Sequence, residues 1–169
     1  MVNSSRMSQT DELLVNARSY ESGHRDVELG PHPVRKVAVL ACMDTRLNPY
    51  LLLGLTEGEA HMIRNAGGVV TDDAIRSLAI SQNVLGTEEV ILIQHTDCGL
   101  LGTTDTELAD RVEAASGSRP DWPFHAFTDL ERSVREGVGR IESSPFLPRR
   151  GSVRGFVFEV QSGRLREVA

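Results

Sequence analysis

Short apolar runs separated by amphipathic segments predict an α/β fold for this chain. Two runs without polar alternation, at 37–41 (VAVLA) and 88–94 (EEVILIQ), are typical of strands buried on both faces of a sheet. Another short strand is expected within 60–68 (AHMIRNAGG), ending in a glycine pair, and the alternating segment 152–160 predicts a C-terminal hairpin that turns at QSG. Strands that alternate with helices favour a mostly parallel central sheet of about four to five strands, flanked by helices.

Residues that favour helix starts and ends divide the rest of the chain. Thr71 is expected to cap a helix, and a helical turn is predicted between Pro49 and Gly54. The buried face of the Thr71 helix, before a stop at Gly86, comprises Ile75, Leu78, Ala79, Gln82 and Leu85. Two later helices begin at capping-box pairs, which are Thr104 with Glu107 and Thr128 with Glu131.

A first helix with a modest apolar face is predicted at 11–20 (DELLVNARSY), capped by Ser8 or Thr10. The Gly-, Pro- and His-containing stretch that follows is incompatible with regular structure. We therefore expect one domain spanning residues 1–169, in which residues 1–35 form an N-terminal helical arm and linker. The face of this helix suits packing on a partner subunit.

Composition and charge narrow the classes of function. Hydrophobic residues make up 40% and charged residues 25% of the 169, which is typical of a soluble globular protein. The net charge of −6 and the scattering of arginines around a single lysine, Lys36, argue against nucleic-acid binding. No stretch approaches the roughly 18 apolar residues that cross a membrane, and the first residues lack the pattern of a signal peptide. We expect a cytoplasmic protein, whose two cysteines do not form a disulfide in a reducing compartment.

Three metal-ligating side chains follow two of the apolar strands. Cys42 comes directly after one strand, and His95 and Cys98 follow the other. Ligands bind beyond the carboxyl ends of the strands in an open parallel sheet, so these side chains meet if the two strands are neighbours. Two thiolates and one imidazole suit zinc and fill three of its four tetrahedral positions. No third cysteine exists, so the fourth position is expected to take water, substrate or a carboxylate.

Asp44 is the nearest carboxylate, and Arg46 follows it by two residues. In an extended segment these side chains point the same way, so Arg46 can hold Asp44 in a two-point pair and keep it off the metal. Asp97 is a second candidate, either as a carboxylate near the metal or as a helix cap for the turn after it. A carboxylate beside a metal can orient a bound hydroxide, which predicts metal-assisted addition of hydroxide to a small electrophile.

Each of these patterns also has an ordinary structural explanation. Two cysteines in such a chain are more often small buried apolar residues, and an Asp-x-Arg pair is common on protein surfaces. Their coincidence at two strand ends, beside glycines that let a ligand approach the backbone, favours the metal site.

The motifs CMDTR, at 42–46, and HTDC, at 95–98, resemble the paired C-x-D-x-R and H-x-x-C motifs of the β-class carbonic anhydrases. The intervening IRNAGG and the helix after it are similar too. The resemblance runs from about Val37 to Gly102, with weaker agreement in the terminal VRGFVFEV. The short chain resembles the compact prokaryotic branch of that family.

The resemblance implies that Cys42, His95 and Cys98 bind Zn²⁺ and that Asp44 and Arg46 form the catalytic dyad. The implied reaction is the reversible hydration of CO2 to bicarbonate by attack of zinc-bound hydroxide, which Asp44 orients.

Further expectations follow from the same resemblance. In some family members the matching aspartate coordinates zinc itself, so Asp44 is also a possible fourth ligand in a closed state. Backbone amides near Gly67 and Gly99 are expected to polarise the substrate. The family works as a dimer or a multiple of dimers, which implies a homodimer or tetramer here.

The chain departs from the family pattern before its first strand. The stretch PHPVRK lacks the glutamine with which plant-type members contact bicarbonate. The proton shuttle is open among His24, His32 and His61. Two alternatives to CO2 hydration also stay open: hydrolysis of CS2 or COS on the same scaffold, and a non-catalytic zinc-binding module in which Asp44 permanently holds the metal.

Overall fold

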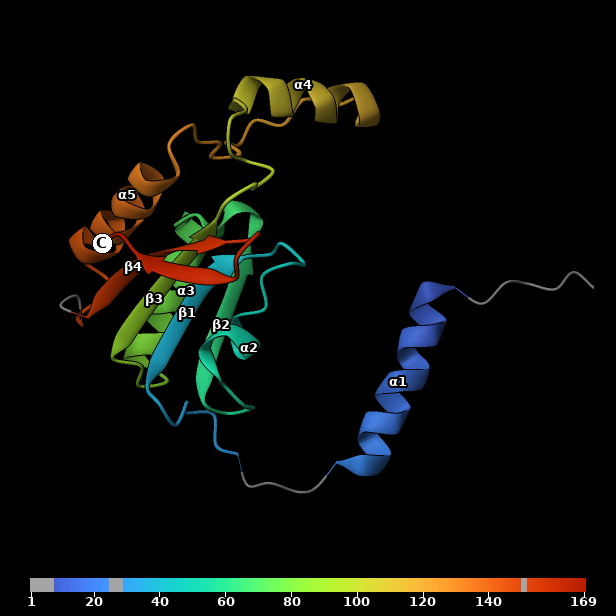
Figure 1. Ribbon diagram of the computed structural model, residues 1–169, viewed down its shortest axis with the longest axis vertical. Helices are drawn as coiled ribbons and strands as arrows, with labels where there is room; N and C mark the ends of the chain where they lie inside the picture. The colour runs from blue at the N-terminus through green and yellow to red at the C-terminus, as the bar shows by residue number, and fades with distance from the viewer. Residues whose placement is uncertain (1–7, 25–28, 150–151) are drawn as a thin grey trace, which may run out of the picture.

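A computed structural model describes residues 8–24, 29–149 and 152–169 of the chain. Its five strands form one sheet in the order β2-β1-β3-β4-β5 (Figure 1). The strands are β1 Val37–Cys42, β2 Ala60–Asn65, β3 Glu89–His95, β4 Val153–Glu159 and β5 Arg164–Glu167. The first four are parallel, and β5 returns antiparallel to β4. The predicted mostly parallel sheet with a C-terminal hairpin is confirmed.

Helices cover both faces of this sheet, which explains why β1 and β3 are apolar without alternation. The helices are α1 Gln9–Gly23, α2 Pro49–Leu53, α3 Asp72–Asn83, α4 Asp105–Ser116 and α5 Leu130–Ser143, with a 3₁₀ turn, η1, at Ala66–Gly68. On the α3 and α5 face, Leu40 and Leu92 pack among residues such as Leu78 and Val134. On the opposite face, α2 and the loops after β1 and β3 cover a second apolar cluster.

Most of the expected helix boundaries are confirmed. The Thr71 side chain accepts a hydrogen bond from Ala74 N, and Thr104 forms the expected capping box with Glu107. Gly54 ends α2 in the left-handed conformation. Of the two candidate caps of α1, Ser8 is the N-cap and Thr10 is not, and the Asp11 side chain completes a capping box with Ser8.

Three boundary predictions were wrong. The strand expected to run to the glycine pair ends at Asn65, and Ala66–Gly68 forms η1 instead. The cap of α5 is Asp129 instead of Thr128, and its side chain accepts from Arg132 N at 3.0 Å. With Asp129 as the cap, Glu131 is not at the position that completes a capping box, and its carboxylate pairs with Arg135 and Arg166. The α3 helix also ends earlier than expected, at Asn83, so Leu85 lies beyond it and only part of the predicted face is fully buried.

The N-terminal arm is described only in part, because residues 1–7 and 25–28 of the predicted 1–35 segment lie outside the described residues. Helix α1 contains no buried residue and projects from the sheet (Figure 1). The Tyr20 hydroxyl donates to Glu57 at 3.1 Å, which links α1 to the loop before β2. None of the helices in the described part of the chain combines the length and apolarity needed to cross a bilayer.

Gly68 is the point at which η1 touches the central strands. Its φ is +60°, and a Cβ built there would lie 2.7 Å from Ile93 O and 2.8 Å from Cys42 N. Both are backbone atoms, so neither can move aside as a flexible side chain would. Only glycine fits between the carboxyl ends of β1 and β3.

We expect Gly68→Ala to lower the free energy of unfolding by about 2–4 kcal/mol, because steric overlap and positive-φ strain act together. Gly139→Ala is the matched control, since nothing lies within 4 Å of its Cβ position in α5. There we expect no loss and a gain of up to about 1 kcal/mol from helix propensity. Urea denaturation measures both, and equal effects of the two substitutions would contradict the argument.

Candidate metal centre

Cys42, His95 and Cys98 meet at the carboxyl ends of β1 and β3, which form a parallel pair. One ligand atom from each residue lies within 4.8 Å of the other two. All three residues are buried, and His95 is completely inaccessible to solvent. The expectation that the two strands are neighbours is confirmed.

His95 presents one ring nitrogen without a partner. Its Nδ1 lies 2.8 Å from Thr96 O. Because a carbonyl only accepts, Nδ1 carries the hydrogen and Nε2 carries the lone pair. This Nε2 is buried and has no hydrogen-bond partner among the described residues. An unpaired buried acceptor costs free energy, which a metal ion at this point would remove.

The pKa of each thiol depends on its hydrogen bond with the other thiol. A hydrogen bond with Cys98 is the main cause that lowers the pKa of the Cys42 thiol to about 4, against the opposing effect of burial. The same pairing, together with burial, raises the pKa of the Cys98 thiol far above its usual range. The protein alone therefore stabilises one thiolate and not the second, since two buried thiolates repel. A divalent cation lets both ionise.

This donor set fits zinc. Thiolate and imidazole are the ligands that Zn²⁺ prefers, and three protein ligands leave the fourth tetrahedral position for chemistry. The unpaired His95 nitrogen and the paired sulfurs are the groups that such an ion would satisfy.

Arg46 holds the Asp44 carboxylate in a two-point ion pair. Arg46 Nε donates to Asp44 Oδ1 at 2.9 Å, and Nη2 donates to Oδ2 at 2.8 Å. The backbone N of Arg46 also donates to Oδ1. Residues 44–46 therefore form a turn, and the expectation of an extended segment was wrong. The side chains meet because the turn folds Arg46 back on Asp44.

Asp97 fixes Arg46 from the other side. The Asp97 carboxylate accepts from Arg46 Nη1, and its carbonyl oxygen accepts from Nη2 at 2.9 Å. Of the two roles left open for Asp97, the helix cap was wrong, because a turn without a helix follows it. Its φ of +58° is a left-handed conformation that aspartate tolerates better than most residues.

These ion pairs keep the dyad charged. The Arg46 side-chain hydrogen bonds are the main cause that holds the pKa of the Asp44 carboxyl well below its usual range. Asp44, and then Asp97, raise the pKa of Arg46 above its usual range. A depressed carboxyl pKa means that the pair is complete above the ordinary carboxyl range and is lost only in strong acid. The dyad therefore does not titrate near neutral pH.

Comparison with known proteins decides the family. A family model described as carbonic anhydrase matches residues 37–122, which include every residue of this centre. The chain is also 49% identical over 165 residues to β-carbonic anhydrase 1 of Mycobacterium tuberculosis, covering 96% of this chain and 99% of the relative. The chain belongs to the β-carbonic anhydrase family.

Two further matches place this carbonic anhydrase within a wider group. The crystal structure of carbonic anhydrase from Streptococcus mutans aligns with a TM-score of 0.91 and 40% identity, covering 97% of this chain and 99% of that chain. Carbon disulfide hydrolase of Acidianus is 35% identical over 159 residues, covering 79% of this chain and 77% of the relative. Zinc is the cofactor of the β-carbonic anhydrases, and the cysteine and histidine cluster fits it.

The two glycines expected near the substrate lie beside the metal centre. Gly67 has φ +76°, and a Cβ there would lie 2.7 Å from Leu100 Cδ1, so it packs against the segment after Cys98. Gly99 directly follows Cys98, with open space where a Cβ would lie. Their action on substrate stays a prediction.

The three histidines expected as proton shuttles are not brought to the centre. His61 lies near the amino end of β2, with Nδ1 2.7 Å from Ser81 Oγ. His32 Nδ1 lies 3.0 Å from Leu85 O, in the segment before β3. His24 lies at the end of α1. None of them occupies the carboxyl edge of the sheet.

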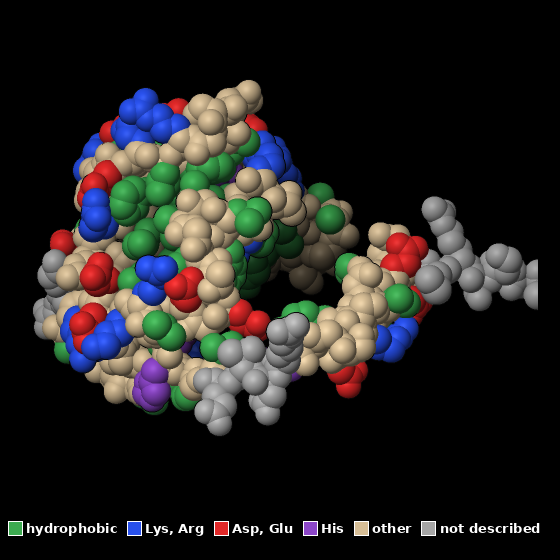
Figure 2. Space-filling model, turned by 60° about the horizontal axis from the view of Figure 1, so that its bottom comes forward, with side chains coloured by type: hydrophobic (Ala, Val, Ile, Leu, Met, Phe, Trp, Pro, Cys, Tyr) green, Lys and Arg blue, Asp and Glu red, His purple; other side chains and the backbone are tan. Residues whose placement is uncertain are grey.

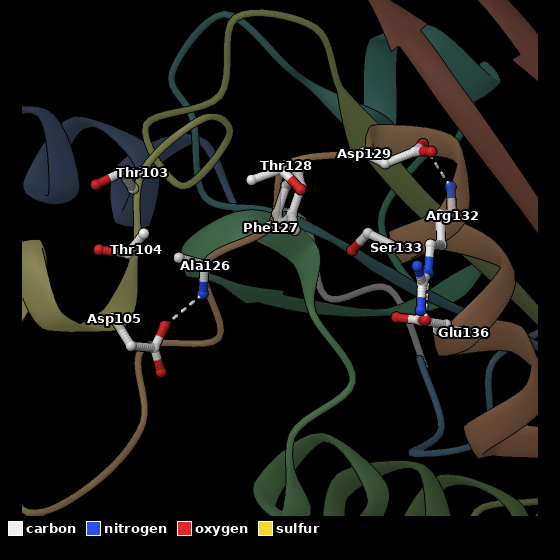
Figure 3. Close-up of a pocket in the computed structure, with 10 residues that line it drawn as sticks. All are labelled: Thr103, Thr104, Asp105, Ala126, Phe127, Thr128, Asp129, Arg132, Ser133 and Glu136. Carbon is white, nitrogen blue, oxygen red and sulfur yellow. Dashed lines mark hydrogen bonds and ion pairs between the residues drawn. The ribbon is translucent and has the colours of Figure 1, made fainter.

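A cavity of about 650 Å³ lies between the start of α4 and α5, lined by none of the residues of the metal centre (Figure 3). Its charged groups already have partners within the cavity wall. Asp105 accepts from Ala126 N at 2.7 Å, and Arg132 pairs with Glu136 at 2.8 Å. Cavity size alone therefore does not mark the active site of this carbonic anhydrase.

We expect the purified enzyme to hold about one zinc ion per chain and Cys42→Ala to lose it, because two protein ligands hold zinc far less tightly than three. Met43→Ala is the matched control, since Met43 is the next residue and its side chain is exposed. Elemental analysis of the desalted proteins measures the stoichiometry. Zinc retained at full occupancy in Cys42→Ala would remove Cys42 from the ligand set.

Proposed function

We propose that this enzyme hydrates carbon dioxide reversibly at the Cys42, His95 and Cys98 centre, with Asp44 as a catalytic residue. The placement of Asp44 carries the proposal. Its Oδ2 lies 3.8 Å from His95 Nε2, while Arg46 holds both carboxylate oxygens. The carboxylate thus lies beside the His95 nitrogen that can bind the metal, and the Arg46 guanidinium restrains it.

Zinc, when bound, lowers the pKa of a coordinated water and so supplies a nucleophile near neutral pH. Asp44 can accept a hydrogen bond from that nucleophile, because each carboxylate oxygen has more than one lone pair. An ionised carboxylate accepts only, so it turns the hydrogen of the nucleophile toward itself and a lone pair toward the carbon of CO2. Arg46 keeps Asp44 ionised and in place.

The contacts of Asp44 favour catalysis over a purely structural zinc site. A non-catalytic module would need the Asp44 carboxylate as a permanent fourth ligand. Three donor atoms of Arg46 converge on that carboxylate, and Asp97 holds Arg46 from the far side. The closed state therefore requires the carboxylate to leave a complete ion pair.

We expect Asp44→Asn to keep its zinc and to lose at least about 100-fold in kcat for CO2 hydration, because an amide cannot replace an acceptor-only carboxylate. Asp110→Asn is the control, since Asp110 lies on α4 in an exposed pair with Arg119. Stopped-flow hydration with zinc analysis of the same samples gives both values. An Asp44→Asn enzyme as active as wild type would contradict the assigned role.

Hydrolysis of carbon disulfide is the second candidate, and the Acidianus relative supports it. CS2 is linear and isoelectronic with CO2 in its valence shell, so the same centre can in principle attack either. The match to a carbonic anhydrase is nevertheless stronger, at 49% identity over 96% of the chain against 35% over 79%.

A side-by-side assay on one zinc-loaded preparation separates the two substrates. We expect rapid CO2 hydration and release of sulfide from CS2 no faster than the buffer background, because the chain matches the hydration enzyme more closely and over more of its length. The Asp44→Asn variant, assayed in the same way, serves as the low-activity control for both reactions. Sulfide release that exceeds CO2 hydration would reverse the assignment.

We also infer a homodimer, or a pair of dimers, in the cytoplasm. Helix α1 exposes Leu13, Leu14 and Tyr20 at 66%, 50% and 58%, and Figure 2 shows apolar side chains on this projecting helix. Exposed apolar side chains gathered on one element are typical of a protein contact. A reducing compartment suits Cys42 and Cys98, because both must stay free thiols to bind zinc.

A further inference from the structure

Arg64 makes a cluster of hydrogen bonds that the reaction described above does not use. It lies in β2, opposite Ala41 of β1. Its Nε donates to Cys42 O at 2.9 Å, and its Nη2 lies 2.6 Å from the same oxygen. Nη2 also reaches Asp44 O at 2.7 Å and Leu47 O at 2.8 Å. One guanidinium thus binds the last carbonyl of β1 and two carbonyls of the turn that follows it.

Cys42, the first predicted zinc ligand, ends β1, and the turn after it, which carries the Asp44 carboxylate, comprises residues 43–48 that belong to no helix or strand. Its backbone is tied to β2 by Met43 N, which donates to Asn65 O at 2.8 Å. Leu47 is fully buried and anchors the far end. Between these two points, the described contacts from β2 to the turn's carbonyls come from Arg64.

We propose that Arg64 is a positioning residue, which fixes the 42–47 turn so that the Asp44 carboxylate stays paired with Arg46 and beside the metal centre. The inference rests on the proposed role of Asp44. The Asp44 carbonyl is held by Arg64 and its carboxylate by Arg46, so one residue is restrained at both its backbone and its side chain. With Asp44 Oδ2 already 3.8 Å from His95 Nε2, a small rotation of the turn changes which group the carboxylate meets.

The chemistry of the contact requires arginine. A guanidinium is planar, permanently charged and able to donate from two nitrogens in fixed directions. Hydrogen bonds from a charged donor are about twice as strong as neutral ones, so three carbonyls can be held by one side chain. A lysine ammonium is a single point donor, so Arg64→Lys is expected to restore only part of the restraint.

The first test compares Arg64→Ala and Arg64→Lys in the zinc-loaded full chain. We expect kcat for CO2 hydration to fall by about 10- to 100-fold in Arg64→Ala, as for other residues that orient a metal centre from outside. Zinc content and KM should stay near wild type, and Arg64→Lys should recover part of kcat. Arg76→Ala is the control, because Arg76 is 72% exposed and pairs only with Asp73 in the described contacts.

A double-mutant cycle distinguishes positioning of Asp44 from general damage. If Arg64 acts through Asp44, adding Arg64→Ala to Asp44→Asn changes kcat by less than about twofold, whereas independent effects would multiply. Cobalt substitution adds a readout that does not depend on turnover. We expect Arg64→Ala to shift the visible cobalt spectrum, because the freed carboxylate approaches the metal, and Asp44→Asn to abolish that shift.

Three results would overturn the inference: kcat of Arg64→Ala within about twofold of wild type, multiplication of the two effects in the cycle, or a cobalt spectrum unchanged by Arg64→Ala. If Arg64→Ala fails to fold, the same cycle with Arg64→Lys decides between these outcomes. A wild-type enzyme that is fully loaded with zinc and yet inactive would instead contradict the proposed function. The cobalt spectra would still test Arg64 in that case.

Discussion

The parallel pairing of β1 with β3 is the contact on which the whole centre depends. It places Cys42, at the end of one strand, next to His95, at the end of the other. Strands that are apolar on both faces do not specify their own register by alternation, because a one-residue slip exchanges one apolar face for another. Gly68 helps to fix the register of β1 and β3. Because it has no Cβ, it can lie close to both Cys42 N and Ile93 O, and this contact requires the two atoms to be near each other.

Around that contact the charges balance in separate groups. If zinc binds, two thiolates would cancel its charge beside a neutral imidazole, while Asp44 and Arg46 cancel each other. Asp97 adds a further carboxylate, but its side chain is 72% exposed and solvent screens it. A centre without excess charge suits a neutral substrate, and it also lets an anionic product leave without breaking a strong attraction.

The sequence predicted those features that depend on local pattern or on a pair of motifs. Apolar runs located β1 and β3, and the spacing of Cys42, His95 and Cys98 identified side chains that the sheet does bring together. The features that the sequence did not predict involve contacts between segments that are far apart in the chain. The cap of α5 is Asp129, one residue later than expected, and Glu131 pairs instead with Arg135 of the same helix and with Arg166 of β5. The contacts of Arg64 were not predictable either, because its partners are backbone carbonyls whose positions depend on the register of β1 and β2.

The orientation of Asp44 shows why a motif underdetermines a mechanism. The letters C-x-D-x-R allow the carboxylate to face the arginine or the metal, and the pairing with Arg46 was expected from an extended segment that the structure does not contain. The turn at 44–46 changes the balance, because Arg46 donates to the carboxylate from its backbone as well as its side chain. For the carboxylate to bind the metal, it must give up all of these charge-assisted hydrogen bonds at once, while Asp97 still holds Arg46 in place. The open arrangement is therefore stabilised by the turn as a unit, so under the proposed mechanism the residues that shape the turn matter as well as those that face the substrate.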